Sequence, residues 1–376
     1  MVVQDDHIRA IGPVGSWTST EPGAAEIVEA PGGTLIAGLI DLHMHVFQWG
    51  QRHDVPWQRE HIMEAAMRGV RNASTLLDAG VTTARDVGCR DNLSIGLRDL
   101  IRTGVVRGPR FLASGTNLQA EGRASYFFQP ISINGPDQAR AAARRQLRAG
   151  ADWIKVMAMA GVGGGTGALV GEPGWQELTE EEIHAAAVEA HHPGRKITAH
   201  AIGTDGIKAA LRAGVDCIEH GSYLDDEAIE LMLARDVPLV PTLIITRNLG
   251  EYGAERGFER NIVERAKRTL EAAMVSACRA QRAGVRVAVG SDVDVNETAA
   301  QEVRMLIEAG LSPMEALLAC TKVAASVIQL QDSIGTLEVG KIADMVILDG
   351  NPLVDPLALD RPSHVIHQGA VVKSPG

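Results

Sequence analysis

The stretch TLIAGLIDLHMHV, residues 34–46, is a short apolar run that ends in two histidines separated by one residue. Side chains two residues apart on an extended strand project to the same face, so His43 and His45 point one way while Leu42 and Met44 point the other. Two imidazoles on one face suit two ligands of a single metal ion, although a strand tip also carries solvated histidines. The rest of the chain decides between these interpretations.

This run is the first of eight short apolar segments that alternate with helix-like segments. The other seven are VTTARDV, RFLASG, DWIKVMA, KITAHAI, CIEHGS, PLVPTLI and RVAVGSD. Several helix-like segments end in Ala-Gly, a helix stop that the next strand follows at once. Eight such units in about 260 residues match a (β/α)8 TIM barrel, which we expect over residues 34–333, with a doubly wound open sheet as the alternative.

The two ends of the chain are predicted to form additional strands. Residues 1–33 contain an alternating stretch followed by Gly and Pro turns, and residues 334–376 alternate again. We expect both termini to combine in a small β-sandwich domain beside the barrel. Residues 311–330 are predicted to form one or two amphipathic helices that close the barrel.

The composition excludes several classes of function. The 376 residues include 36 Lys and Arg against 47 Asp and Glu, and the net charge of −11 opposes binding to nucleic acid or to an anionic membrane. The four cysteines form no CxxC pair, so neither a disulfide framework nor a cysteine zinc site is expected. There is no signal-like N-terminus, and no apolar run reaches about 18 residues. We therefore expect a cytoplasmic protein that acts on a small molecule, with a homo-oligomer as an open option.

Polar residues at the ends of the predicted strands would share one rim of a barrel, where barrel enzymes carry their chemistry. Each alone has an ordinary structural explanation, such as a hydrogen-bonded histidine, a snorkelling lysine or a helix-capping aspartate. Six together on five strands point to a metal centre instead. They are His43, His45, Lys155, His200, His220 and Asp292.

Four imidazoles exceed what one catalytic zinc needs, because such a site takes three protein ligands and leaves one position open. Two metal ions are therefore expected. A group that bridges two cations should be anionic and rich in oxygen, which an ammonium is not. Burial beside cations lowers a lysine pKa, however, and the neutral amine can add carbon dioxide to become a carbamate with two ligand oxygens. Lys155 is the candidate for this carboxylation.

The segments DLHMH, WIKVMA, ITAHA, CIEHGS and VGSD, with GTLEVGKIADMVILD near the C-terminus, resemble the amidohydrolase superfamily of binuclear metal-dependent hydrolases over nearly the whole chain. The pattern is most similar to the branch of Xaa-Pro dipeptidases and imidazolonepropionase-related enzymes. The resemblance implies that His43, His45 and Asp292 hold one ion and that His200 and His220 hold the other.

The resemblance also implies the chemistry. Carboxylated Lys155 and a hydroxide would bridge two divalent ions, with zinc as the expected metal. The ions would polarise the substrate carbonyl, and Asp292 would accept the proton of the nucleophile and deliver it to the leaving nitrogen. We expect Asp292, Lys155 and His220 to be the catalytic group.

Two departures from the family pattern affect the expectations. Relatives begin with an additional strand, so the small domain is expected to be incomplete in this sequence. Many peptidase-like relatives carry a Gly-Gly-His-Gly segment after the third strand, where this chain reads SGTNLQAEGRASYFFQP without a histidine. This difference weakens the expectation that a peptide carboxylate is recognised.

Three residues are candidates for contact with substrate. Tyr223, just beyond His220, is expected to bind a carboxylate or the scissile carbonyl, or else to pack on the rim. Arg85 is expected to form a structural pair with Asp86, or to face an acidic substrate. Phe127, in the aromatic segment YFFQP, is expected to line a pocket for an apolar or aromatic acyl group, or to pack beneath a loop.

The glycine-rich segment GVGGGTGA nearly matches a dinucleotide-binding fingerprint at Gly163, Gly165 and Ala168. The fingerprint must open a helix, and Gly171 and Pro173 follow too soon for that. We therefore interpret the segment as a loop over the active site.

The sequence thus predicts a hydrolase that cleaves the amide bond of N-acyl amino acids or dipeptides by means of a metal-bridged hydroxide. A hydrolase of neutral amides, carbamates or ureas, including xenobiotics, would use the same metal chemistry. A non-catalytic scaffold is the alternative of another class, but a scaffold has no need to keep six metal ligands.

Overall fold

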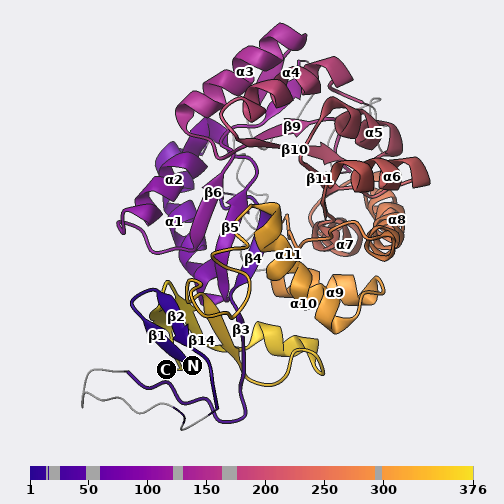
Figure 1. Cartoon of the computed structure of the whole chain (residues 1–376). Helices are drawn as coiled ribbons and strands as arrows, with labels where there is room; N and C mark the ends of the chain where they lie inside the picture. Colours follow the sequence, from indigo (N-terminus) through magenta and orange to yellow (C-terminus); the bar gives the residue numbers. More distant parts are fainter. Residues whose placement is uncertain are drawn as a thin grey trace.

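The protein has an α/β structure, seen in the computed structural model in Figure 1, in which helices lie on the outer side of parallel strands. The described residues are 1–13, 16, 26–47, 60–121, 130–162, 176–292 and 299–375. Among the helices they form, none combines the length and the apolar character that crossing a bilayer requires.

Two parallel sheets contain most of the strands. The first has the spatial order β4 (Leu39–Met44), β5 (Val81–Asp86) and β6 (Arg110–Ala113). The second has the spatial order β12 (Leu239–Val240), β11 (Cys217–His220), β10 (Lys196–Ala201), β9 (Trp153–Met157), β7 (Leu118–Ala120) and β8 (Ile131–Ile133). Parallel neighbours need crossover connections, and helices supply all of them except the connection from β7 to β8, most of which lies outside the described residues.

The helices begin and end at ordinary local signals. Capping boxes start α4 at Thr179 and α10 at Ser312, and glycines in the left-handed conformation end α3, α5 and α8, as the Ala-Gly pattern predicts. The helices predicted at residues 311–330 are α10 and α11. The α-helices are α1 (Ile62–Asp78), α2 (Leu93–Arg102), α3 (Pro136–Ala149), α4 (Glu180–His191), α5 (Thr204–Ala213), α6 (Asp226–Arg235), α7 (Leu243–Tyr252), α8 (Arg260–Ala283), α9 (Ala299–Glu308), α10 (Pro313–Ala319) and α11 (Lys322–Val327), and the short 3-10 helices are η2 (Arg90–Asn92) and η3 (Pro356–Asp360).

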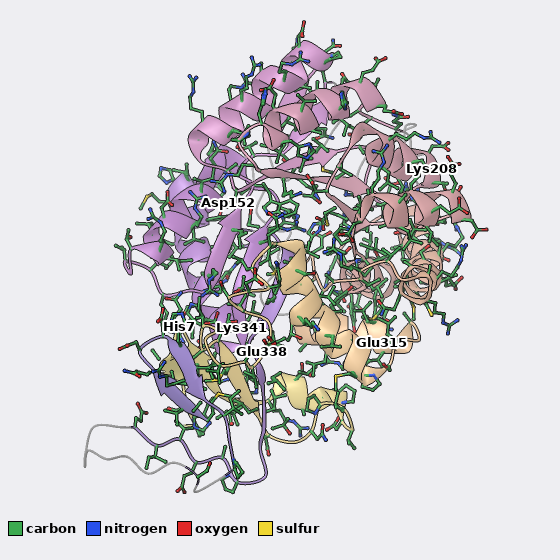
Figure 2. All side chains as sticks on the ribbon, in the orientation of Figure 1. His7, Asp152, Lys208, Glu315, Glu338 and Lys341 are labelled. Carbon is green, nitrogen blue, oxygen red and sulfur yellow. The ribbon has the colours of Figure 1, made fainter. Side chains whose placement is uncertain are left out.

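One junction between the two parallel sheets lies at Asp152, labelled in Figure 2, where β6 meets the start of β9. The backbone N–H of Asp152 donates to the carbonyl of Ala113 (2.8 Å). Its carboxylate accepts the N–H of the same alanine (3.0 Å) and Nη1 of Arg98 (2.7 Å). Main-chain pairing therefore continues from one sheet to the other.

The second junction is the segment 286–292, which runs between β12 and β4. The N–H of Ala288 donates to the carbonyl of Leu239 (2.9 Å), and the N–H of Leu42 donates to the carbonyl of Val289 (3.0 Å). The segment thus occupies the position expected for the eighth strand, although it forms one isolated bridge, between Val287 and Leu239, rather than a regular strand.

The first predicted strand is in fact two strands that belong to different sheets. β3 (Thr34–Ala37) pairs antiparallel with β13 (Met345–Leu348), and only β4 joins the parallel strands, so the prediction of one continuous strand over residues 34–46 is wrong. The chain changes sheet at Gly38, where a Cβ would overlap the side chain of Thr82. The absence of a side chain there allows the close approach that separates the strands.

Two further strand predictions differ from the structure. The segment PLVPTLI forms only the two-residue strand β12, because α7 already begins at Leu243. The short strands β7 and β8 follow β6 along the sequence, in a part of the chain for which no strand was predicted.

The two ends of the chain lie side by side (Figure 1). The C-terminal strands β14 (Pro362–His367) and β15 (Ala370–Lys373) extend the antiparallel sheet to the order β15-β14-β13-β3. The hairpin of β1 (Val2–Gln4) and β2 (His7–Ala10) packs against this sheet through Ile8. Figure 2 labels His7 of this hairpin near Glu338 and Lys341, which precede β13.

Candidate metal centre

The candidate ligands lie at the carboxyl ends of the parallel strands. His43 is near the end of β4, Lys155 is on β9, and His200 and His220 are at the ends of β10 and β11. Asp292 follows the segment that pairs with β4, and its N–H donates to the carbonyl of His43 (2.7 Å). The parallel arrangement therefore brings residues from distant parts of the sequence to one rim.

Four imidazoles and one carboxylate form a single cluster. The ring centroid of His43 lies 5.3 Å from that of His45 and 5.0 Å from that of His220. The ring centroids of His220 and His200 lie 4.4 Å apart. Oδ1 of Asp292 lies 3.2 Å from Nε2 of His45 and 3.4 Å from Nε2 of His43. The cluster has the ligand types and the proximity that a centre for divalent ions requires.

One set of three atoms in this cluster already fits a single ion. His43, His45 and Asp292 each offer one ligand atom, and these atoms lie within 4.8 Å of one another. Two imidazoles and a carboxylate are a common donor set for zinc and related ions. His43 and His45 thus share a candidate metal site with an aspartate about 250 residues away.

Lys155 and His200 each have a buried nitrogen without a hydrogen-bond partner in the described part of the chain. These atoms are Nζ of Lys155 and Nε2 of His200. Buried polar atoms are nearly always satisfied, so two orphaned nitrogens beside the cluster indicate a missing ligand. The residues present therefore fit a metal centre larger than the site of three.

Burial controls the charge of the imidazoles and of the lysine. It lowers the pKa of His43 and His220 well below the ordinary value and lowers the pKa of His200 to about 3, with Lys155 as a further cause. These rings are therefore neutral at pH 7, the form that binds metals. Burial also lowers the pKa of Lys155, although the negative charge of Glu219 opposes this effect.

Asp292 behaves differently from the other buried groups. Burial raises its pKa, but the imidazoles of His43 and His45 and the charge of Lys155 outweigh burial, so the pKa of Asp292 lies below its ordinary value. Asp292 is therefore an anion at neutral pH. It can act both as a ligand and as an acceptor of a proton.

Hydrogen bonds to Nδ1 orient two of the imidazoles. Nδ1 of His43 lies 2.8 Å from Oε2 of Glu219, and Nδ1 of His45 lies 2.9 Å from the carbonyl oxygen of Gly88. A carbonyl and an ionised carboxylate can only accept, so each Nδ1 is the donor, and Nε2 is the nitrogen that is left to bind an ion. Both Nε2 atoms face Asp292, which is where an ion would be held.

Glu219 is a functional residue that the sequence interpretation missed. It is fully buried and accepts hydrogen bonds from Nη2 of Arg85 (2.6 Å) and from the hydroxyl of Thr198, besides the bond from His43. A charged residue next to His220 within the apolar strand CIEHGS was the available signal. Neighbouring residues of a strand project to opposite faces, so the side chain of Glu219 points away from that of His220. It reaches Nδ1 of His43 instead.

Asp41 fixes the first strand against the segment that carries Asp292. Its carboxylate accepts the N–H of His43 (3.0 Å), the N–H of Ser291 (3.1 Å) and the hydroxyl of Ser291 (2.7 Å). Burial raises the pKa of Asp41 to about 6, against these hydrogen bonds. The candidate ligands from β4 and from residue 292 are therefore held in register by a shared buried carboxyl group.

Arg85 lies beneath the site. It is fully buried, donates through Nε to the carbonyl of Leu42 (2.7 Å), and places its guanidinium 4.4 Å from the ring centroid of Trp153. Its ionic partner is Glu219. These contacts give Arg85 a structural role, in which it holds the end of β4 and Glu219 in place. No observation in the described part of the chain supports its predicted contact with substrate.

The predicted pair of Arg85 with Asp86 is wrong. Consecutive residues of a strand point to opposite faces, so the two side chains of β5 separate. Asp86 instead accepts the N–H groups of Val46 (3.1 Å) and Gly88 (3.2 Å), and burial raises its pKa to about 6. It thereby shapes the loop whose carbonyl orients His45.

The other predicted substrate contacts have different outcomes. The hydroxyl of Tyr223 lies 3.3 Å from Oγ1 of Thr269 on α8, and the tyrosine packs against the core at the rim, as the second interpretation of this residue describes. Phe127 lies outside the described residues, and so does the glycine-rich segment 163–175. Contact of Tyr223 or Phe127 with substrate stays a prediction.

The cluster of candidate ligands at one rim is an arrangement that a metal-dependent hydrolase requires. The sequence model of the amidohydrolase family matches residues 34–372, and the chain belongs to this family. The family resemblance inferred from the motifs is confirmed.

Individual relatives agree with this assignment. The ochratoxinase of Aspergillus niger is 29% identical over 91% of this chain and 76% of its own length. The crystal structure of a Xaa-Pro dipeptidase with methionine bound in its active site has a TM-score of 0.87 and 28% identity, and covers 99% of this chain and 94% of its own. A putative prolidase from Bifidobacterium longum has a TM-score of 0.86 and 32% identity, and covers 100% and 89%.

Proposed function

We propose that this protein is a binuclear metal-dependent hydrolase that cleaves the amide bond of N-acyl amino acids or dipeptides. The observation that carries the proposal is the convergence of four imidazoles, an anionic aspartate and an orphaned buried lysine at one rim. A non-catalytic scaffold would gain nothing from such a set, because buried polar groups without partners destabilise a fold.

The residues divide into two sets toward the ions. His43, His45 and Asp292 would hold one ion, and His200 and His220 would hold the other. Carboxylated Lys155 would be shared, and its buried, unpaired Nζ supports this role because an uncharged amine is the form that adds carbon dioxide. Bound divalent ions, zinc in our proposal, supply Lewis acidity and lower the pKa of a coordinated water.

The side chains supply the proton transfers and the orientation. Asp292, anionic and beside the imidazoles, would take the proton of the attacking water and pass it to the leaving nitrogen. His43 and His45 cannot turn away from the site, because Glu219 and Gly88 hold their Nδ1 atoms. The chain thus brings a preorganised set of ligands, which is the condition for electrostatic stabilisation of a transition state.

The same proposal extends to the architecture. We propose that the two parallel sheets are arcs of one (β/α)8 barrel, closed at Asp152 on one side and by residues 286–292 on the other. The four-stranded sheet and the β1–β2 hairpin would then form the small β-sandwich domain, with Ile8 and Ile366 in their shared apolar cluster.

An amino acid on one side of the scissile bond is supported by the relatives. One of them is a Xaa-Pro dipeptidase with methionine in its active site, and another is a putative prolidase. In this chain Tyr223 would meet the carboxylate or the scissile carbonyl, and Phe127 would line the pocket of the acyl group.

One observation favours a second candidate, a hydrolase of neutral amides, carbamates or ureas. Arg85, for which contact with an acidic substrate was the alternative to a structural role, is fully buried and paired with Glu219. The segment after the third strand also lacks the histidine of peptidase-like relatives. A substrate without a free carboxylate would need neither group.

The deciding experiment compares an N-aroyl amino acid with its methyl ester and its primary amide, using protein loaded with zinc, manganese or cobalt. We expect the free acid to be cleaved fastest and Tyr223→Phe to reduce this preference. Equal or faster cleavage of the neutral forms, unchanged in Tyr223→Phe, would replace the first candidate by the second. Elemental analysis is expected to give two ions per chain, and a stoichiometry of one would contradict the binuclear proposal.

A further inference from the structure

The segment between β12 and α7 presents a hydroxyl to a candidate metal ligand. Oγ1 of Thr242 lies 2.6 Å from Nδ1 of His220, and both side chains are buried. When Nδ1 of a histidine is held by a hydrogen bond, Nε2 is the nitrogen that remains to bind an ion. The hydroxyl therefore orients the ring of His220.

The side chain of Thr242 does not cap the helix that follows it. It stands at the N-cap of α7, where a threonine normally accepts a backbone N–H of the first turn, yet its side chain makes no such bond. Glu302 of α9 caps the helix instead, because its two oxygens accept the N–H groups of Leu243 (2.8 Å) and Ile244 (2.9 Å). The hydroxyl is thereby left for His220.

The backbone of Thr242 supports the same conclusion. Its φ of 49° and ψ of 50° lie in the left-handed region, which β-branched residues rarely adopt. Such a conformation persists only where the surroundings impose it, and it is concentrated at functional sites. Glu302 is fully buried and fixes the two N–H groups that directly follow Thr242, so it is a group that imposes the conformation.

We propose that Thr242 is a positioning residue of the metal centre and that Glu302 holds it in place. The inference rests on the proposed function in that His220 is taken as a metal ligand. A neutral hydroxyl supports His220, whereas the carboxylate of Glu219 supports His43. A carboxylate partner raises the basicity of an imidazole ligand, so His220 is expected to be the less basic of these two ligands.

The test compares three substitutions of Thr242 in the full-length chain. Thr242→Val removes the hydroxyl and keeps the β-branched shape, Thr242→Ser keeps the hydroxyl, and Thr242→Gly removes the hydroxyl but suits the left-handed backbone. Zinc and cobalt affinities are measured by competition with a chromophoric chelator. Thermal unfolding of each metal-free protein is recorded in parallel.

We expect Thr242→Val and Thr242→Gly to weaken one of the two ions about 10–100-fold and Thr242→Ser to bind both nearly as the parent does. The metal-free glycine variant is expected to unfold at or above the parental Tm, which separates positioning from stability. Glu302→Gln, which keeps one acceptor oxygen, is expected to weaken the same ion by a smaller factor.

Parental affinity for both ions in Thr242→Gly would overturn the proposal, and so would equal losses in the serine and glycine variants. A lower Tm of the metal-free variants with unchanged affinities would also overturn it, because Thr242 would then have only a structural role. The parent protein tests the proposed function separately. A parent that binds fewer than two ions overturns the binuclear centre itself, before any variant is considered.

Discussion

Replacing Arg85 by methionine separates a structural role of this residue from a role in substrate binding. The guanidinium is fully buried, 2.6 Å from Glu219, and Glu219 is itself fully buried. Methionine retains apolar packing against Trp153 but removes the charge. Removing one partner of a buried ion pair destabilises a protein by about 3–5 kcal/mol, because the other charge stays buried without compensation.

The expected change in Tm follows from the size of the chain. Globular proteins unfold with an entropy of roughly 2.1 cal/mol/K per residue near 60 °C, which for 376 residues is about 0.8 kcal/mol/K. A loss of about 3–5 kcal/mol in the free energy of unfolding then lowers Tm by about 4–6 °C. Differential scanning calorimetry of the metal-free protein measures this shift without interference from bound ions.

A second substitution provides the control. Glu219→Gln removes the buried charge but keeps a carbonyl oxygen that can accept the N–H of His43. The double variant with Arg85→Met is therefore expected to regain most of the lost Tm, whereas each single variant leaves one buried charge uncompensated. A Tm of Arg85→Met within about 1 °C of the parent, together with a raised KM for substrates that carry a carboxylate, would refute this reasoning and return Arg85 to the substrate site.

Three further predictions concern the ligands and their surroundings. Gly290→Ala would place a Cβ 2.6 Å from Cβ and 2.9 Å from the backbone nitrogen of His43. This substitution is expected to lower the metal content and to lower the free energy of unfolding by about 1–3 kcal/mol, as checked by metal analysis and calorimetry. Lys155→Arg is expected to lose metal irreversibly, whereas Lys155→Ala should regain part of its activity in a short carboxylic acid, as assayed by hydrolysis and metal content. Burial raises the pKa of Glu302 from its ordinary 4.5 to about 8. The stability that protonated Glu302 contributes is therefore present below pH 4.5 and is lost as pH rises through 8. Glu302→Gln should flatten the fall in Tm of the metal-free protein across this range.

Local pattern was sufficient to find the candidate ligands. His43 and His45 follow from the two-residue period of a strand, and His200, His220 and Asp292 follow from the rule that parallel strands end at one edge. These inferences need only the direction of a side chain and the end of an element. The structure brings all five side chains together at the expected rim.

The supporting residues could not be found in the same way. The capping of Leu243 by Glu302 joins residues 59 apart, and the bond between His43 and Glu219 joins residues 176 apart. No period in the sequence encodes such contacts, because they depend on how finished elements pack. The split at Gly38 was missed for a related reason, since the apolar pattern continues through it while the chain changes sheet.

Backbone strain at the rim links stability to the geometry of the centre. His220, Thr242 and Asp292 are non-glycine residues with φ of 73°, 49° and 54°, and such conformations destabilise a native state by about 1–3 kcal/mol each. Their sum is a large part of the 5–15 kcal/mol by which a typical domain is stable. The buried carboxyl groups that offset it are Asp41, which accepts the N–H just before Asp292, and Glu302, which accepts the N–H groups just after Thr242. The hydrogen bonds of Asp41 and Glu302 therefore both offset the backbone strain and hold in place the segments that carry Asp292 and Thr242.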